Sequence, residues 1–339
     1  MNDVARAAGV SQATVSFVLN DRRDIPVAPA TRQRVLEAAS TLRYRTDRRA
    51  QELRIGRSTT IGVVSHGVAS HPFAGSILRG LQREALRRSH AVMVIDVDVE
   101  ATAADVTDAV AGLVDRGVGA VVHASAGTRP VQIGDVDGAV RTAFVACWPA
   151  DGSAPGEALL LPDDRGGGRA VAAHVLGLGH RSIAFLGGPA RDHARRERER
   201  GLDEALGLAG LPLDSVRRFD GDYGTRSGYR LAARVLEGDD RPSALLCGND
   251  QMALGAYLAA RDLGLRVPHD LSIAGYDDQE ALANQLVPEL STVALPHDAL
   301  GARAAEILIG DPPPEPVTEF VECEVVVRES TSPPPLNTY

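Results

Sequence analysis

Polar and aromatic residues follow several apolar, strand-like runs of this chain. Asp277 follows the run 271–274, in the sequence GYDD, and Arg198 lies in the helical stretch after the run 182–186. Carboxylates and amides bind hydroxyl groups, a bidentate arginine adds direction, and an aromatic face covers an apolar ring. Such groups match the needs of a sugar or a nucleoside. The candidate ligand-binding residues are His71, Phe73, Arg198, Tyr223, Asn249, Asp250 and Asp277.

Four of these candidates also have a purely structural interpretation. Asn249 or Asp250 could be the N-cap of the helix that follows them. Tyr223 could be an ordinary packing residue. Arg198 belongs to the run RRERER, which is typical of a solvated helix face. The sequence leaves these alternatives open.

The elements that must position these residues alternate between strands and helices. The predicted strands are 60–65, 91–96, 118–123, 142–147, 182–186, 216–219, 244–247 and 271–274. The predicted helices are 73–88, 103–115, a weaker one near 131–136, 166–178, 194–209, 225–237 and 251–263. This alternation predicts two doubly wound parallel sheets with helices on both faces. Because ligands bind at the carboxyl ends of such strands, we expect the site in the cleft between the two lobes.

A separate segment near the N-terminus, Asp3–Asn20, predicts two short helices joined by a tight turn. Gly9 can adopt the positive φ of a helix C-cap, and Ser11 is a good N-cap for a helix over Gln12–Asn20. The two helices and their turn predict a helix-turn-helix that can enter a DNA major groove.

The second of these helices has two distinct faces. The i, i+3, i+4 spacing places the buried face at Val15, Val18 and Leu19. The outward face carries Gln12, Ala13, Ser16, Phe17 and Asn20. A mostly polar outward face is what a DNA-reading helix requires.

A third helix and an uneven charge distribution support this interpretation. The stretch Thr31–Arg45 predicts a helix with Pro29 at its first turn. Its apolar stripe is formed by Val35, Leu36, Ala39 and Leu42. Residues 1–58 hold eleven arginines against six acidic residues, a net charge of +5, whereas the whole chain carries −9, which leaves −14 for the rest. A basic head on an acidic body suits a module that contacts phosphates.

Several motifs, in their order and spacing, resemble the lactose/galactose repressor (LacI/GalR) family of bacterial transcription regulators. The N-terminal motifs are DVARAAGVSQATVSFVLN, TRQRVLEAASTLRYR and AQELRIGRSTTIGVV. The later motifs are LGHRSIAFLGGP, LLCGNDQMALGA, IAGYDDQ, LSTVALP and VVVREST. The resemblance covers nearly the whole chain.

The resemblance implies an α/β fold, in which an N-terminal all-α helix-turn-helix DNA-binding domain precedes a two-lobed core like that of periplasmic binding proteins. The implied domains are a headpiece (1–45), a hinge helix or linker (46–58), an effector-binding and dimerisation core (59–330) and a Pro-rich tail (331–339). The chain crosses between the lobes three times. The implied N-lobe is about 59–161 and 292–318, and the implied C-lobe is about 162–291 and 319–330.

The resemblance also implies site residues and partners. The DNA-binding residues would be Ser11, Gln12, Ala13, Thr14, Ser16, Phe17, Asn20, Arg22 and Leu53, and the family's inducer contacts map onto the ligand candidates above. The stretch RRAQEL, 48–53, is too short to be a stable helix alone. We expect it to become helical when two copies pair on a pseudo-palindromic double-stranded operator, with Leu53 wedged into the minor groove.

The chain departs from the family at several positions. Phe17 stands where an arginine is usual, which removes one guanine or phosphate contact and suits a thymine methyl. Ala28 replaces a usual serine cap. His71 and Ala74 stand where asparagine and a second phenylalanine are common. The usual Thr or Ser cap of the first helix is missing, which leaves open whether the true start codon lies upstream.

Enzyme signatures are absent from the sequence. Gly166–Gly168 is not followed by GK[ST], and the chain has no lysine; HExxH, paired metal-ligand spacings and GxSxG are also missing. His180 is interpreted as a turn residue. Cys147, Cys247 and Cys323 are odd in number and lie in apolar runs, which predicts reduced core residues. No apolar run of 18 residues and no signal-peptide core are present, so we expect a cytoplasmic protein without a membrane span.

The sequence therefore predicts a homodimeric transcription regulator, in the role of a repressor, whose operator affinity is controlled by a small sugar-like effector between the lobes. No catalytic residue, metal or cofactor is expected. The alternative is a sugar- or nucleoside-binding protein of the periplasmic type with no role in DNA regulation. The N-terminal helix-turn-helix argues against that alternative.

Overall fold

The computed structural model describes residues 1–19, 22, 25–44, 58–69, 74–134, 140–238 and 240–335. The chain divides into two compact units, Met1–Thr59 and Thr60–Tyr339, and each unit has its own buried apolar core.

The first unit is a cluster of three helices. They are α1 (Asn2–Ala8), α2 (Gln12–Leu19) and α3 (Pro29–Thr41). Gly9 adopts φ +64° at the C-cap of α1, and the Ser11 hydroxyl accepts a hydrogen bond from the backbone N–H of Thr14 (3.1 Å). Both local signals that predicted the turn are confirmed. The helices are held together by the buried side chains of Val4, Ala5, Ala8, Val15, Val18, Val35 and Ala39.

The apolar stripe predicted for the third helix is wrong at two positions. Leu36 and Leu42 have exposed fractions of 45% and 46% in this unit. Val35 and Ala39 define the inward face, and Leu36 is rotated about 100° from Val35. The helix ends at Thr41 rather than Arg45, because Arg43 adopts φ +46°. Leu42 is therefore a C-cap residue, outside the periodic stripe.

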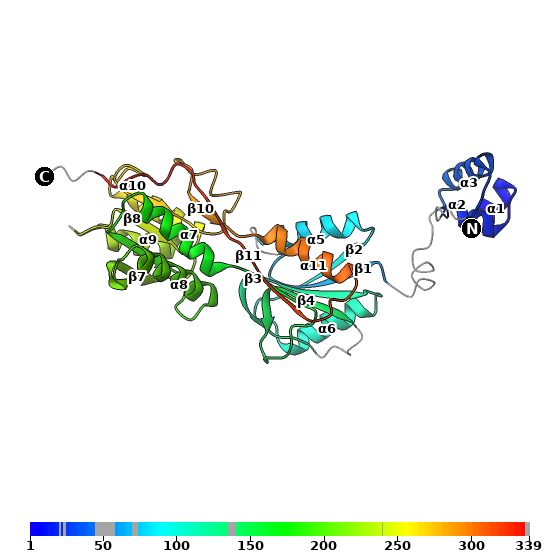
Figure 1. The fold of residues 1–339 in the computed structure, drawn as a ribbon, viewed down its shortest axis with the longest axis horizontal. Coiled ribbons are helices and arrows are strands. Elements are labelled where there is room, and N and C mark those ends of the chain that lie inside the picture. The colour runs from blue at the N-terminus through cyan, green and yellow to red at the C-terminus, as the bar shows by residue number, and fades with distance from the viewer. Residues whose placement is uncertain are drawn as a thin grey trace. The chain divides into compact units, whose positions relative to one another are not determined.

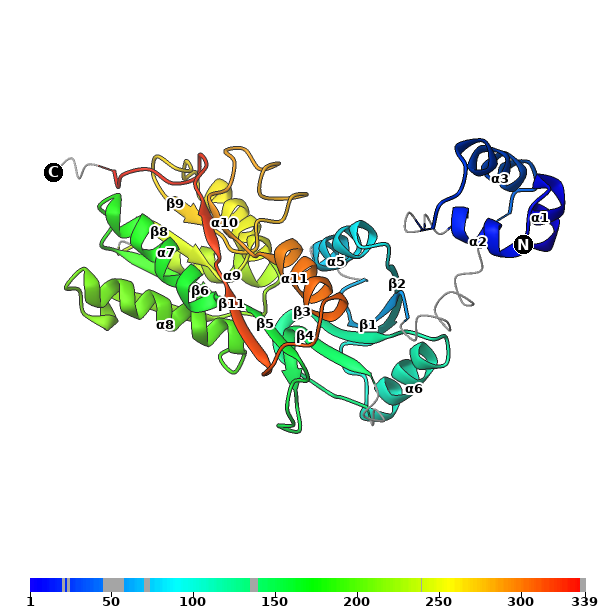
Figure 2. The same cartoon turned by 45° about the vertical axis from the view of Figure 1, so that its right-hand side comes forward.

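The second unit contains a six-stranded parallel sheet with the order β11-β5-β4-β3-β1-β2. Its strands are β1 (Thr60–His66), β2 (Ala91–Val97), β3 (Ala120–Val131), β4 (Arg141–Pro149), β5 (Ala158–Pro162) and β11 (Val317–Val321). Its helices are α5 (Gly75–Arg87), α6 (Ala103–Val114) and α11 (His297–Ile309). We call this sheet with its three helices the N-lobe (Figures 1 and 2).

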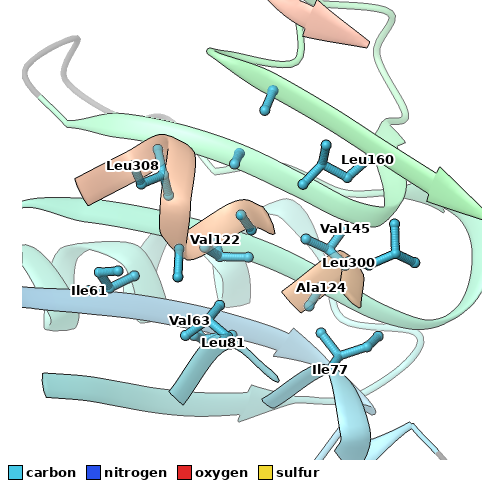
Figure 3. Close-up of a cluster of buried hydrophobic side chains, with 14 of the residues drawn as sticks. Ile61, Val63, Ile77, Leu81, Val122, Ala124, Val145, Leu160, Leu300 and Leu308 are labelled. Carbon is cyan, nitrogen blue, oxygen red and sulfur yellow. The ribbon is translucent and has the colours of Figure 1, made fainter. Parts of the chain in front are cut away.

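Alternating side chains along the strands bury the two faces of this sheet under different helices. Ile61 and Val63 of β1 pack against Ile77 and Leu81 of α5 and against α11, as Figure 3 shows. Val64, the next residue of β1, packs against α6 on the opposite face. The strands are thus buried on both sides, as expected for a parallel sheet.

A four-stranded parallel sheet with the order β7-β6-β8-β9 forms the other half of this unit. Its strands are β6 (Ile183–Gly187), β7 (Val216–Asp220), β8 (Ala244–Cys247) and β9 (Ser272–Ala274). Its helices are α7 (Asp164–Gly177), α8 (His193–Leu208), α9 (Thr225–Leu236) and α10 (Asp250–Asp262), with a short 3₁₀ turn, η1 (Leu213–Ser215). Helices α7 and α8 cover one face, and α9 and α10 cover the other. We call this half the C-lobe.

Three connections join the lobes: β5 to α7, β10 (Thr292–Ala294) to α11, and β11 to β12 (Glu324–Val326). β10 and β12 pair as an antiparallel ribbon, whose Val293 packs into the C-lobe core. The predicted fold class, with an all-α head and two doubly wound parallel sheets, is confirmed.

Differences from the predicted elements concentrate around β3. This strand is longer than predicted, and its pairing with β4 shifts register between Ala124 and Arg129. The weak helix predicted near 131–136 is wrong over 131–134, because Val131 ends β3 and 132–134 have no regular structure; 135 and 136 lie outside the described residues. The strands β5, β10, β11 and β12 and the helix α11 were not predicted. β10 and β12 are only three residues long, and prolines lie in or beside β5 and β11, so none of these strands gives a clear alternation.

The strand orders place one switch point in each lobe. In the N-lobe, the chain runs from β1 to β2 toward one edge of the sheet and from β3 to β4 toward the other edge. In the C-lobe, it likewise runs from β6 to β7 toward one edge and from β8 to β9 toward the other. Crevices form at such points, outside the carboxyl ends of the strands. The topology therefore selects the ends of β1, β3, β6 and β8 as the place for a site.

Candidate functional site

A cavity of about 570 Å³ lies between the two lobes. The N-lobe lines it with residues from the ends of β1 and β3 and the start of α11. The C-lobe lines it with residues that follow β6, β7, β8 and β9. This volume falls within the range of small-molecule sites in proteins.

Arg198, on α8, is fixed in the C-lobe wall of the cavity. Its Nε donates to Asp164 Oδ1 (2.8 Å) and its Nη1 to the Gly248 carbonyl (2.5 Å). The guanidinium carbon lies 3.6 Å from the ring centroid of Tyr276. Burial is the largest single effect on the guanidinium and lowers its pKa. The charge of Asp164 and those of the other neighbours together outweigh burial, so the pKa stands well above its ordinary value. The interpretation of 195–200 as a solvated face is wrong for Arg198, which is 7% exposed.

Asp277 lies beside Arg198 on the same wall. Its Oδ1 is 3.9 Å from Arg198 Nη2, and its Oδ2 accepts a hydrogen bond from Gln279 Nε2 (3.1 Å). The residue adopts φ +110°, which turns the chain sharply after β9. Burial raises the pKa of the carboxyl to about 6, and Arg198 acts in the opposite direction. The guanidinium of Arg198 beside it favours the carboxylate form, which can accept hydrogen bonds from hydroxyl groups.

The structure separates the neighbours Asn249 and Asp250. Asn249 is the N-cap of α10, where its Oδ1 accepts from the Met252 backbone N–H (2.9 Å), and it also lines the cavity. Asp250 is fully buried and does not line the cavity. Its carboxyl group accepts from the Thr292 hydroxyl (2.6 Å) and from the Gln279 backbone N–H (2.7 Å), and burial together with the charge of Asp277 raises its pKa.

The prediction that Asp250 faces the ligand is therefore corrected: this carboxylate holds the loop after β9 against α10. The physical reason is the change of backbone direction at the helix start. Asn249 is still extended, with φ −157°, and Asp250 is the first helical residue. Their side chains consequently leave the chain in different directions.

Tyr223 combines packing with a place on the cavity wall. Its hydroxyl donates to Asp192 Oδ1 (2.7 Å), and the backbone adopts φ +65°. Its ring also packs against the C-lobe core. Burial raises the pKa of the phenol, so it stays protonated. Asp192, which sequence reasoning missed, is fixed a second time by capping α8 through the Arg195 backbone N–H (3.0 Å).

On the N-lobe side, the predicted residues His71 and Phe73 lie outside the described residues. The structure instead shows other residues that the sequence reasoning missed: His66, Ser125, Thr128, Arg129 and His297. His66 is the last residue of β1, where a polar residue ends an apolar run, and that signal was available. Ser125, Thr128 and Arg129 line the cavity because β3 is longer than predicted, and His297 lines it because the chain returns to the N-lobe at the start of α11.

His66 belongs to a stack of rings at the end of β1 and β3. His66 Nε2 lies 3.5 Å from His123 Nδ1, and the ring of His123 stacks on Phe144 with centroids 4.8 Å apart. Burial lowers the pKa of His66 to about 4 and that of His123 to about 3. Both histidines are therefore neutral at pH 7.

In the headpiece, the outward face of α2 has the predicted composition. Gln12 and Ala13 are exposed, while Ser16 and Phe17 are half-buried. The Thr14 hydroxyl lies 2.9 Å from that of Ser11. The Arg22 backbone N–H donates to the carbonyl of Phe17 (3.0 Å). Asn20 and Leu53 lie outside the described residues.

Other sequence predictions concern residues away from this cavity. The three cysteines are free and buried. His180 is a buried turn residue, whose ring contacts the Ser243 hydroxyl (2.8 Å) and the Ser332 carbonyl (2.7 Å). Among the described residues, no cluster of His, Cys, Asp and Glu could hold a metal ion. Within the same part of the chain, no helix is long and apolar enough to cross a membrane.

Comparison with known proteins agrees with both units. The profile described as bacterial regulatory proteins, lacI family, matches residues 1–47, and that of a periplasmic binding protein-like domain matches 172–331. The sucrose operon repressor of Escherichia coli is 30% identical over 337 residues, which covers 98% of this chain and 99% of that protein.

Two solved structures extend the comparison. The lac repressor dimer bound to operator and the anti-inducer ONPF is 28% identical, with a TM-score of 0.75, and covers 97% of this chain and 98% of its own. The complex of the transcriptional regulator CelR with cellobiose is 27% identical, with a TM-score of 0.63 and the same coverage of both chains. The resemblance drawn from the motifs is confirmed, and the chain is a DNA-binding transcription regulator that belongs to the lacI family of bacterial regulatory proteins.

Proposed function

We propose that the cavity between the lobes binds a small polyhydroxylated effector that controls operator binding, and that the protein acts as a repressor. The observation that carries this proposal is the fixed orientation of the polar groups in the C-lobe wall. Arg198 and Asn249 are held by their own hydrogen bonds, and Asp277 by Gln279. Groups fixed in advance lose little entropy when a ligand binds.

The chemistry of these groups supports a sugar-like ligand. A carboxylate, an amide and a guanidinium in one wall can bind adjacent hydroxyls, and the ring of Tyr223 offers an apolar surface. The names of the relatives are consistent with this class, since one is a sucrose operon repressor and another was solved with cellobiose. We propose Arg198, Tyr223, Asn249 and Asp277 as effector contacts, add Asp192, and retain His71 and Phe73 as predictions.

For the DNA side, we propose that the outward face of α2 reads base edges, and that the hinge contacts the minor groove. The proposed DNA contacts are Ser11, Gln12, Ala13, Thr14, Ser16, Phe17, Asn20, Arg22 and Leu53. A homodimer on a pseudo-palindromic operator fits this arrangement, since each recognition helix reads one half-site. Because its target is DNA, we place the protein in the cytoplasm, and we propose that it binds its ligand without transforming it.

We propose the domain division given by the motifs: headpiece 1–45, hinge 46–58, core 59–330 and tail 331–339. The boundary between the N-lobe and C-lobe segments after residue 318 is moved to follow residue 321. β11 pairs with β5 as far as Val321, so 319–321 belong with the N-lobe sheet.

A mobility-shift assay tests the proposal. It uses the DNA upstream of the gene that encodes this protein, and it is run with and without each member of a panel of sugars and nucleosides. A panel member should change operator affinity, and calorimetry should show that it binds the wild-type protein. Asp277→Ala should abolish that response while the ligand-free protein still binds the operator, because Asp277 lines the effector cavity and is not a residue of the headpiece. Asp277→Asn, which keeps the volume, checks that the loss is not misfolding, and the exposed Asp214→Ala is the control. Unchanged ligand affinity in Asp277→Ala would place the site elsewhere.

A further inference from the structure

The two walls of the cavity carry opposite charge. Carboxylates dominate the C-lobe wall, where Asp192, Asp222 and Asp277 line the cavity. Arg198 adds little net charge there, because it is already paired with Asp164 (2.8 Å). The N-lobe wall carries the guanidinium of Arg129.

Arg129 lacks a close carboxylate among the described residues. The nearest ion pair is with Glu100, at 3.9 Å, and the Glu100 side chain is 89% exposed, whereas that of Arg129 is 27% exposed. A pair at this distance with a solvated carboxylate neutralises little of the charge.

Arg129 is nevertheless held in place. Its Nε donates to the Ser125 hydroxyl (3.3 Å), and its Nη2 donates to the Val99 carbonyl. Both partners are neutral, so these hydrogen bonds orient the guanidinium without cancelling its charge. The register shift of β3 between Ala124 and Arg129 brings the whole segment 125–129 to the cavity wall.

The positive charge of Arg129 changes the pKa of a neighbouring side chain, His66. Burial is the largest cause that lowers the pKa of His66 to about 4, and the positive charge of Arg129 is the second. The charge of Asp96 acts in the opposite direction. The neighbouring ring is therefore neutral at pH 7, and Arg129 is left as a positive charge that faces a largely acidic wall.

We propose that the effector carries one anionic group, a carboxylate or a phosphate, which Arg129 binds while the hydroxyl groups of the same molecule contact the C-lobe wall. This inference rests on the proposed function, because it specifies the chemistry of the same site. A guanidinium presents its donors in a planar fork that fits carboxylate and phosphate oxygens. The cavity volume of about 570 Å³ leaves room for a sugar acid or a sugar phosphate.

Calorimetry with matched ligands tests the inference. The probes are D-glucose, D-gluconate, D-glucuronate and D-glucose 6-phosphate, and the corresponding galactose and ribose series. We expect at least one anionic member to bind ten times more tightly than its neutral parent at low salt. The carboxylate and phosphate arms identify which anion is bound. The preference should shrink as salt is raised, since partly exposed charges are screened.

Three variants sharpen the test. Arg129→Gln should remove the preference for the anionic member, and Arg129→Lys should keep part of it, because the charge remains. Glu100→Gln, at the exposed partner, should preserve or increase the preference. Circular dichroism of each variant checks that it is folded.

The inference is wrong if a neutral sugar binds as tightly as its acid and phosphate, if Arg129→Gln keeps the preference, or if no anionic probe binds. The proposed function has a separate readout. A neutral sugar that releases the operator would overturn the anionic inference and leave the proposed function intact, whereas failure of every ligand in the full panel to alter operator affinity would overturn both.

Discussion

Thr128 of the N-lobe donates a hydrogen bond across the lobes to Asp164 of the C-lobe, with Oγ1 and Oδ2 3.2 Å apart. The other oxygen of the same carboxylate accepts from Arg198 (2.8 Å). A group on the cavity wall of one lobe is thus linked through a single buried carboxylate to the other lobe. Such a link can couple ligand contact to the angle between lobes, since a ligand shifts a conformational equilibrium only through differential contacts.

Thr128→Val should weaken this link without changing the side-chain volume much. The variant loses a hydrogen bond to a charged group, and we expect the apparent effector Kd to rise by about tenfold, which corresponds to about 1.4 kcal/mol. Effector titration of operator release measures it. Thr128→Ser, which keeps the hydroxyl, is the control and should stay near wild type. Equal response curves for Thr128→Val and wild type would show that the bond plays no part in the switch.

Stability should depend on pH through Asp277 and its buried neighbour Asp250, because the charge of each carboxylate disfavours ionisation of the other. Its pKa is raised to about 6 by burial, so the folded state binds more protons than the unfolded state between about pH 4 and 6. The free energy of unfolding therefore falls as pH rises through this window, and the penalty is complete only about one pH unit above 6. Asp277→Asn removes that penalty, so urea denaturation should show the variant gaining stability relative to wild type between pH 4 and pH 7.

Asp270 provides a control of opposite sign. Its hydrogen-bonded ion pair with Arg266 lowers the pKa of this half-buried carboxyl, so its contribution is present at neutral pH and is lost on acidification. Asp270→Asn should lose stability relative to wild type at pH 7 and recover at low pH. The same pH trend in both variants would contradict the assignment to Asp277.

The outward face of α2 should determine operator preference. Replacing Gln12 or Phe17 with alanine should change the preferred base at one operator position by about 1–3 kcal/mol. Competition binding with a library of operator variants measures the change. Gln33→Ala, on an exposed part of α3, serves as the comparison. Uniform weakening on all sequences would mean that these side chains do not read bases.

Leu53→Ala tests the predicted hinge wedge. The residue lies outside the described part of the chain, so the prediction depends on the family resemblance. The variant should keep effector binding and dimerisation but bind the specific operator more weakly and bend it less, because an apolar wedge unstacks a base step. Gel-shift bend analysis and calorimetry provide the two readouts. Full affinity and an unchanged bend angle in this variant would exclude the wedge.

Two glycines should respond in opposite ways to alanine. A Cβ at Gly80 of α5 would lie 1.9 Å from the carbonyl oxygen of Asp298 at the start of α11, so the helices must move apart. We expect Gly80→Ala to lower the free energy of unfolding by about 1–3 kcal/mol. Gly177, at the end of α7, has no atom within 4 Å of a built Cβ, and Gly177→Ala should raise stability by up to about 1 kcal/mol. Thermal denaturation of both variants measures the difference, and equal losses would contradict close packing of α5 on α11.

The sequence by itself determined the local elements and the class of site. Periodicity predicted most of the helices and strands, because strands buried on both faces and amphipathic helices have distinct patterns, but it missed α11 and placed a helix wrongly over 131–134. The turn at Gly9 and Ser11 was readable, since a positive φ and an N-cap depend on single residues. The motifs around Arg198, Asn249 and Asp277 pointed to strand ends, and the topology does bring those three residues to one cavity wall.

Only the tertiary structure decided which polar residues face the cavity and what charge they carry there. Asp250 and Asn249 are neighbours in sequence, but the start of α10 turns one inward and leaves the other on the wall. Leu36 fits an apolar stripe in sequence, but the packing of three helices leaves it exposed. The approach of Thr128 to Asp164, and the position of Arg129, depend on the register shift of β3 and on chain connections between lobes. Contacts between residues far apart in sequence leave no periodic signal, so they are settled only when the lobes pack.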